Sequence, residues 1–142
     1  MSPSENCVFC RIVQGAIPCL KIHEDAAVLA FLDIGPLADG HLLVIPKEHF
    51  ERPEQMSEEA FGGVMKVVPR LAKAVLRATG ADAYNVLLNA GRAASQEVMH
   101  LHVHIIPRRH GDGLGYRWLA KRYEAGRGER LAEEVLQALK SV

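Results

Sequence analysis

Three histidines alternate with apolar residues in the segment Met99–Pro107, and this pattern constrains the fold more than any other feature of the chain. Successive side chains of a β-strand point to opposite faces, so His100, His102 and His104 are expected on one face. The apolar residues between them would then point into the core. A solvated polar face would normally mix lysine, glutamate, threonine and serine, so the histidines indicate a functional site.

The three histidines are too far apart to bind one metal ion together. A strand rises about 3.3 Å per residue, which places His100 and His104 about 13 Å apart along it. A histidine nitrogen binds zinc at about 2.0–2.1 Å. Neighbouring pairs could still share an ion, but the spacing favours different roles for the three side chains.

The rest of the sequence predicts an α+β domain built on an antiparallel sheet of about five strands. One long helix is expected from Ser57 to Thr79, since Ser57 is a suitable N-cap and apolar residues follow at three-and-four spacing. Gly80 would end it, and Pro69 should kink it or divide it in two. The expected strands are Leu20–His23, Ala27–Asp33, His41–Ile45, Tyr84–Asn89 and Met99–Pro107.

Two further helices are expected at the ends of the chain. A short one covers Phe9–Gln14, and a C-terminal one runs from about Glu129 to Lys140. The apolar residues expected on the buried face of the C-terminal helix are Leu131, Val135, Leu136 and Leu139. At 142 residues the chain fits one domain, with a core over 1–108 and a C-terminal extension over 109–142 packing on the same domain.

Composition narrows the function classes. Seventeen basic residues balance seventeen acidic ones without a basic stripe, which argues against a nucleic-acid partner. The sequence shows no signal peptide and no apolar run of membrane-spanning length, so we expect a cytoplasmic protein without a membrane partner. Cys7 and Cys10 form a C-x-x-C, and Cys19 makes the count odd. Metal or redox chemistry is therefore favoured over a structural disulfide.

A loop of small and polar residues, Asn89–Val98, leads into the histidine segment. Its backbone N–H groups can approach phosphate oxygens, and its carboxamides can donate hydrogen bonds. Such a loop is more often an ordinary turn, but its position directly before the histidines favours phosphate binding.

These segments together resemble the signature of the histidine-triad (HIT) superfamily. The alternating histidines are followed by two apolar residues, and Phe31–Ile34 and Gly40–Lys47 resemble the family's earlier blocks in the same order. The resemblance covers about Cys7 to Arg108. It is similar to the bacterial branch related to Hint-type purine nucleoside phosphoramidases.

The resemblance implies a hydrolase that cleaves the P–N or acyl–P bond of nucleoside 5′-monophosphate conjugates and releases AMP or GMP. His102 would attack the α-phosphorus and form a nucleotidyl-histidine, which water then hydrolyses. His104, helped by Asn89 and Gln96, would stabilise charge on the phosphoryl oxygens. No divalent metal is expected to take part in the chemistry.

The family match also assigns binding roles. Asp33 would accept hydrogen bonds from the ribose hydroxyls, and His41 would sit beside the site. The base pocket would be lined by Phe9, Ile12, Phe31 and Ile34, for which plain core packing is the alternative.

Two positions depart from the family pattern. Glu97 stands where eukaryotic members carry serine or threonine near the leaving group, and Ser95 replaces the usual glycine of the phosphate loop. Glu97 is either an acid for the leaving group, which requires a raised pKa, or a solvated carboxylate outside the reaction. Both changes leave the leaving-group preference open.

Many bacterial members pair a C-x-x-C with two histidines, which correspond here to His49 and His100. A closed tetrahedral site for structural zinc would then be formed by Cys7, Cys10, His49 and His100, with two free thiols as the alternative.

The family further implies a homodimer, with Trp118 in the tail as either a specificity residue or a packing anchor. Three other functions stay open: a dinucleoside polyphosphate hydrolase, a nucleotide-binding adaptor with incidental catalysis, and a zinc-dependent regulatory protein.

Overall fold

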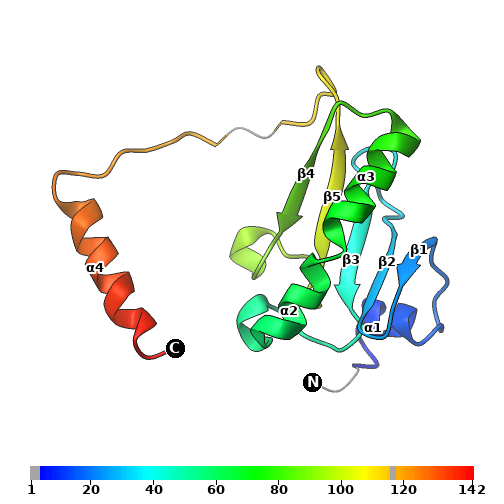
Figure 1. The fold of residues 1–142 in the computed structure, drawn as a ribbon, viewed down its shortest axis with the longest axis horizontal. Coiled ribbons are helices and arrows are strands. Elements are labelled where there is room, and N and C mark those ends of the chain that lie inside the picture. Colours follow the sequence, from blue (N-terminus) through cyan, green and yellow to red (C-terminus); the bar gives the residue numbers. More distant parts are fainter. Residues whose placement is uncertain (1–3, 116–117) are drawn as a thin grey trace.

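A twisted antiparallel sheet lies between helices in the computed structural model, which describes residues 4–115 and 118–142 (Figure 1). In spatial order the five strands are β1 (Lys21–Glu24), β2 (Val28–Leu32), β3 (Leu42–Pro46), β5 (Val103–Arg108) and β4 (Ala83–Leu88). Each neighbouring pair is antiparallel. The predicted α+β class and the five-stranded antiparallel sheet are confirmed.

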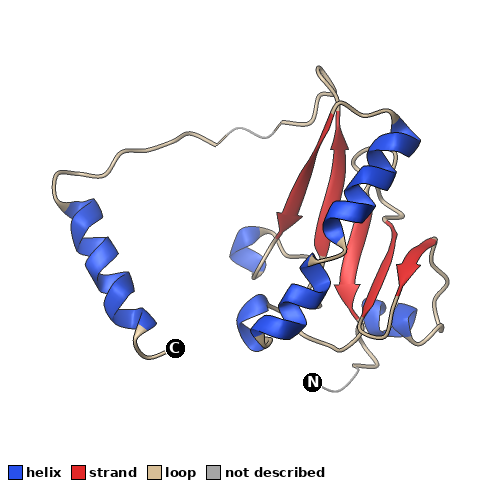
Figure 2. Ribbon diagram, in the orientation of Figure 1, coloured by secondary structure: helices blue, strands red, loops and turns tan. Residues whose placement is uncertain are grey.

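Helices cover both faces of the sheet (Figure 2). They are α1 (Val8–Val13), α2 (Glu58–Met65) and α3 (Val68–Thr79), whereas α4 (Arg127–Leu139) lies apart from the sheet. Short 3-10 turns lie at Pro53–Gln55 and Arg92–Ala94. In the figure α2 and α3 cross in front of the sheet and α1 lies behind it.

Side-chain alternation along β2 and β3 divides the apolar core into two layers. Even-numbered residues pack against α2 and α3, and odd-numbered residues pack against α1. The first layer includes Val28, Ala30, Leu42 and Val44, and the second includes Leu29, Phe31, Leu43 and Ile45. The layer around α1 is the one that adjoins the histidines.

The expected helix over residues 57–79 is divided into α2 and α3, as Pro69 indicated. Ser57 caps α2, because its Oγ accepts a hydrogen bond from the backbone N–H of Ala60 at 3.1 Å. Pro69 is the second residue of α3, where a missing N–H costs no intrahelical hydrogen bond. Gly80 ends α3 in the left-handed conformation with φ 64°, as expected.

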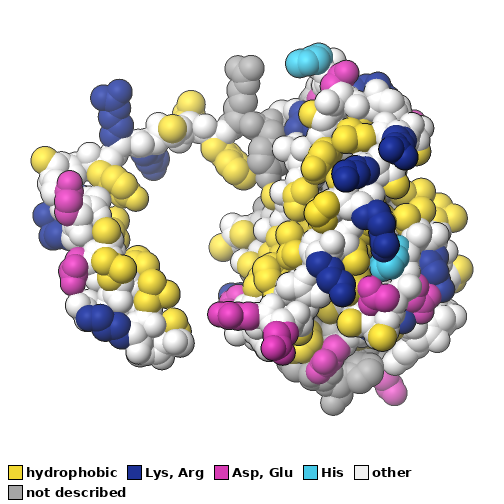
Figure 3. Space-filling model, in the orientation of Figure 1, with side chains coloured by type: hydrophobic (Ala, Val, Ile, Leu, Met, Phe, Trp, Pro, Cys, Tyr) yellow, Lys and Arg dark blue, Asp and Glu magenta, His cyan; other side chains and the backbone are white. Residues whose placement is uncertain are grey.

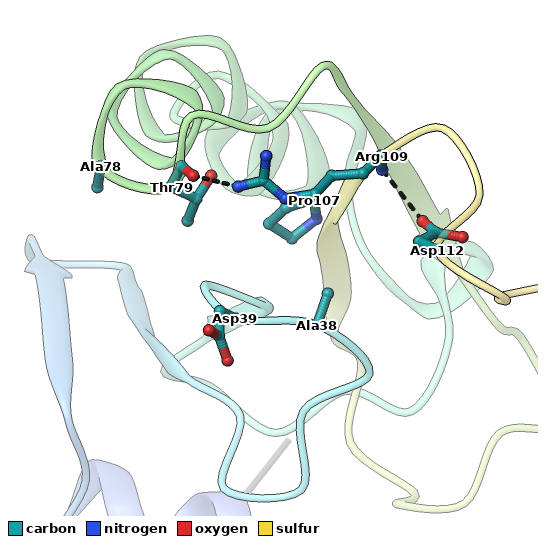
Figure 4. A pocket seen from close by; sticks show the side chains of 7 residues that line it. All are labelled: Ala38, Asp39, Ala78, Thr79, Pro107, Arg109 and Asp112. Carbon is teal, nitrogen blue, oxygen red and sulfur yellow. Dashed lines mark hydrogen bonds between the residues drawn. The ribbon is translucent and has the colours of Figure 1, made fainter.

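Arg109 ties the end of β5 to the end of α3 (Figure 4). Its guanidinium donates to the carbonyl oxygens of Thr79 and, at 3.0 Å, of Gly80. These carbonyls have no partner within the helix, so the arginine caps it. A cavity of about 350 Å³ beside this contact has no histidine in its lining. It lies outside the histidine site.

The histidine segment is only partly a strand, which corrects the predicted bounds. β5 begins at Val103, and Met99–His102 is a connection that begins in a bend. The register pairs Val44 with Val103, so its continuation would place Pro46 opposite Leu101. Proline has no N–H to donate, and the backbone N–H of Leu101 instead donates to the carbonyl of Phe50 at 2.6 Å. The predicted alternation of side chains between the two faces is nevertheless present, since Leu101, Val103 and Ile105 all lie in the core.

The C-terminal helix stands apart from the sheet in Figure 1. Val135, Leu136 and Leu139 are each more than half exposed, so the buried face expected for this helix does not form within one chain. The start of the extension contacts the core, since Arg109 bonds to the end of α3, whereas α4 lies away from the sheet. The boundary at residue 108 stays a prediction, and residues 1–3 of that core lie outside the described residues.

None of the helices in the described part of the chain is long and apolar enough to cross a membrane.

Candidate functional site

His102 is held in one tautomer by the backbone. Its Nδ1 lies 2.7 Å from the carbonyl oxygen of His100, and its side chain is 7 % exposed. Because a carbonyl can only accept, Nδ1 carries the hydrogen and Nε2 carries the free lone pair. The ring of Phe9 packs edge-on at 5.2 Å between ring centroids and fixes the imidazole plane. His102 therefore presents an unprotonated Nε2, which is the state that a nucleophilic nitrogen requires.

His41 sets the tautomer of His104 through a chain of hydrogen bonds. The backbone N–H of Leu37 donates to Nδ1 of His41 at 3.1 Å, so the hydrogen of His41 resides on Nε2. That N–H donates to Nδ1 of His104 at 2.9 Å, which leaves a hydrogen on Nε2 of His104. The buried His41 thus lies beside the site, as predicted, and makes His104 a hydrogen-bond donor.

His104 is neutral near pH 7. Burial lowers its pKa to about 4, and the neighbouring His102 and His41 act in the same direction while Asp33 opposes them. Burial also lowers the pKa of His41. A neutral N–H of this kind can stabilise a phosphoryl oxygen without having to lose a proton first.

Two cavities meet at His102 and His104. One of about 240 Å³ has a polar lining that includes His41, Asn89 and Ser95. The other, of about 300 Å³, is mostly apolar and is lined by the predicted base-pocket residues Phe9, Ile12, Phe31 and Ile34, although Ile34 is 92 % exposed. Asp33, Glu97, His102 and His104 border both cavities. The sizes and linings suit a phosphate beside a planar base.

The sequence missed one wall of the apolar cavity. This wall is formed by Ile17, Pro18 and Cys19, which lie between α1 and β1. The only signal was their position just beyond the expected first helix, and no spacing pattern marked them.

Gln96 does not have the role predicted for it. Its side chain is 3 % exposed, and its Oε1 accepts from the N–H of Gly91 at 2.7 Å. Its Nε2 donates to the carbonyls of Glu51 at 2.9 Å and Val98 at 3.1 Å. With both amide hydrogens used, Gln96 shapes the loop and cannot also donate to a phosphoryl oxygen.

Ser95 occupies the conformation that favours glycine, with φ 68°. Its carbonyl accepts a hydrogen bond from Nδ2 of Asn89 at 3.4 Å, so the end of β4 is joined to this loop. Both residues line the polar cavity.

The four predicted metal ligands converge on one point, with all ligand atoms within 4.8 Å of one another. They are Cys7, Cys10, His49 and His100. Nε2 of His100 lies 2.8 Å from the carbonyl of Pro46, so Nδ1 is the nitrogen free to bind a metal. That Nδ1 lies 3.4 Å from Sγ of Cys7 and 3.2 Å from Nδ1 of His49. Neighbouring ligand atoms in tetrahedral zinc sites are separated by about 3.3–3.8 Å. The donor set therefore fits zinc.

Burial raises the pKa of the Cys7 thiol; the hydrogen bond from the backbone N–H of Cys10 opposes this rise, and the Cys10 thiol adds to it. A bound cation would oppose the rise and stabilise the thiolate.

A second group, Asp33, His41 and His104, is also close enough for a metal. The facing nitrogens of its two histidines already share a hydrogen bond, which accounts for their approach without an ion.

Comparison with known proteins decides the family. Residues 14–111 match the HIT domain. The chain is 43 % identical over 136 residues to the adenosine 5′-monophosphoramidase hnt1 of Schizosaccharomyces pombe, covering 95 % of this chain and 99 % of that protein. The chain belongs to the HIT family.

A second HIT relative, the adenylylsulfatase HINT3 of Arabidopsis thaliana, is 44 % identical over 109 residues. The match covers 77 % of this chain and 55 % of that protein, so the chain spans little more than half of the relative's length.

Solved structures of HIT proteins share the fold. A protein of Streptococcus mutans superimposes with a TM-score of 0.92 at 38 % identity, covering 98 % of this chain and 89 % of that one. A zinc-bound histidine triad protein of Mycobacterium smegmatis gives a TM-score of 0.74 at 41 % identity, covering 94 % of this chain and 97 % of that one. The resemblance stated from the sequence is confirmed.

Proposed function

We propose that this HIT protein hydrolyses the P–N or acyl–P bond of nucleoside 5′-monophosphate conjugates and releases AMP or GMP. The observation that carries the proposal is the 2.7 Å contact between Nδ1 of His102 and the carbonyl of His100, which leaves Nε2 with its lone pair beside the two cavities. The names of the fission-yeast phosphoramidase and the plant adenylylsulfatase support the same class of reaction.

The reaction proceeds in two displacements at phosphorus. Nε2 of His102 bonds to the α-phosphorus while the P–N bond breaks, and the amine nitrogen leaves with that electron pair and a proton from solvent. The resulting imidazolium keeps its Nδ1–H on the carbonyl of His100. Water then attacks phosphorus, the bond to Nε2 breaks, and a proton is released to solvent. Each step is easier than a direct displacement by water.

Binding follows from the two cavities. Nε2–H of His104 and the amide of Asn89 point to the phosphoryl oxygens, and the Asp33 carboxylate accepts from the ribose hydroxyls. A purine stacks in the apolar cavity beside Phe9 and Phe31, which pack edge to face at 5.7 Å between ring centroids. The neutral donor from His104 is in place before charge develops, so it costs little reorganisation.

Zinc would be held by Cys7, Cys10, His49 and His100 and would supply a structural cross-link without entering the chemistry. The cluster joins α1 to the segment before β5, and His100 also provides the carbonyl that orients His102.

A cytoplasmic homodimer is the form we propose in solution, with no nucleic-acid or membrane partner. β4 is an edge strand with Tyr84 and Val86 each at least 40 % exposed, and α4 carries an uncovered apolar face. A second copy would cover both surfaces.

The test is AMP release from an adenosine phosphoramidate by wild type and His102→Ala, with diadenosine tetraphosphate assayed in parallel. We expect kcat/KM for the phosphoramidate to fall at least about 1,000-fold in the variant, since the nucleophile is lost. His110→Ala, which changes an exposed histidine outside both cavities, should keep wild-type turnover. Turnover of the tetraphosphate alone would identify a dinucleoside polyphosphate hydrolase. AMP binding without turnover of either substrate would identify an adaptor.

A further inference from the structure

We propose that Glu97 selects the leaving group, favouring amine leaving groups that carry a further positive charge near the scissile bond over anionic ones. The substrate class is then an adenosine phosphoramidate of a cationic amine, such as a diamine or a lysine side chain in a basic context. This inference rests on the proposed function and deepens it.

Glu97 stands at the junction of three cavities. Besides the polar and apolar cavities at His102, a third of about 390 Å³ has Asn6, Glu51 and Met99 in its lining together with Glu97. Among the described residues, Glu97 alone borders all three. A group that departs from a phosphate held at His102 and His104 therefore passes close to this carboxylate.

The backbone on both sides of Glu97 is fixed. Gln96 is buried and makes three hydrogen bonds, one of which joins its Nε2 to the carbonyl of Val98 at 3.1 Å. Val98 packs against the apolar layer around α1. The exposed side chain of Glu97 thus projects from an anchored segment, so its charge keeps a defined place beside the site.

The charge balance of the three cavities favours cations. Their linings hold the carboxylates of Asp33, Glu51 and Glu97, and no lysine or arginine of residues 4–115 and 118–142 lines any of them. Within the same residues, Glu97 has neither an ion pair nor a hydrogen bond through its side chain. A polyphosphate or carboxylate leaving group would meet this charge without a compensating cation. A unit charge at about 4 Å in water changes an affinity about fivefold, and more where solvent is partly excluded.

The experiment compares two adenosine phosphoramidates that share one alkyl linker, which ends in an ammonium group in the first and a carboxylate in the second. The ratio of their kcat/KM values is measured for wild type, Glu97→Gln and Glu97→Lys. Glu59→Gln on α2 is the matched control, because it removes the same charge from an exposed residue outside all three cavities.

We expect wild type to prefer the ammonium substrate, Glu97→Gln to lower the ratio about 3- to 10-fold, and Glu97→Lys to invert it. The preference should weaken in high salt. A ratio in Glu97→Gln that matches Glu59→Gln within twofold would overturn the role of Glu97, even if both rates fall together. In that case turnover by wild type still supports the proposed function. Absence of turnover of both substrates by wild type would overturn the function itself and the inference with it.

Discussion

Backbone groups decide what each histidine of the site can do. The carbonyls of Pro46 and His100 each take one ring N–H, and the N–H of Leu37 is donated to a ring nitrogen of His41. In each ring, one nitrogen is therefore occupied by a hydrogen bond to the backbone. That bond decides whether the other nitrogen carries a hydrogen or a free lone pair. This difference is the basis on which we propose three roles for three chemically identical side chains: metal ligand, nucleophile and hydrogen-bond donor.

The half-buried His104 makes stability depend on pH. Its pKa is about 4 in the folded chain against an ordinary value of 6.5, so the unfolded chain binds more protons between these values. The contribution of His104 is complete above pH 6.5 and is lost as pH falls toward 4. We expect the free energy of unfolding to fall by about 1–2 kcal/mol between pH 7 and pH 5 through this residue.

Urea unfolding of wild type and His104→Gln at both pH values, with zinc present throughout, measures this contribution. The variant should lose less stability on acidification than wild type. Equal losses would mean that His104 does not carry the pH dependence.

At the scale of elements, the zinc ligands connect three parts of the chain that lie far apart in the sequence. Cys7 and Cys10 belong to the α1 region, His49 follows β3, and His100 precedes β5. Sγ of Cys10 lies 3.3 Å from Nδ1 of His49. A single zinc ion can therefore cross-link the α1 region, the segment after β3 and the segment before β5.

Removing zinc should lower stability more than activity. We expect a chelator, or Cys10→Ser, to lower the Tm by about 5 °C or more, while kcat/KM well below the Tm stays within about twofold. Cys19→Ser, which changes the cysteine outside the cluster, should bind zinc as wild type does. Loss of turnover on chelation without unfolding would show that the metal takes part in the reaction.

Sequence patterns located the elements better than their ends. The division of the long helix was correctly predicted from Pro69, because a missing backbone N–H affects only the helix in which the proline lies. The start of β5 was wrong because it depends on Pro46, which lies on the neighbouring strand and stops the ladder there. Gln96 was misassigned for a similar reason, since its hydrogen bonds to Gly91 and Glu51 form only in the folded loop.

At the scale of the whole molecule, the sequence periodicity of α4 predicted an apolar face. It could not predict which surface covers that face. Figure 3 shows hydrophobic side chains along the flank of α4 that faces the domain, with charged side chains on its other sides. Val135, Leu136 and Leu139 contribute to the uncovered face. An amphipathic helix gains most of its stability from tertiary packing, so α4 needs a partner surface.

A second copy of the chain is the cover that we propose, and it makes stability depend on concentration. We expect wild type to sediment as a dimer, with a Tm that rises with protein concentration. Leu136→Glu should weaken the dimer, because it places a charge in the apolar face. Gln137→Glu adds the same charge at a strongly exposed residue that is hydrogen-bonded to Glu133, and should leave the dimer intact. If wild type sediments as a monomer at micromolar concentration, α4 must be covered by something other than this chain, and its apolar face would then mark a binding surface for another protein.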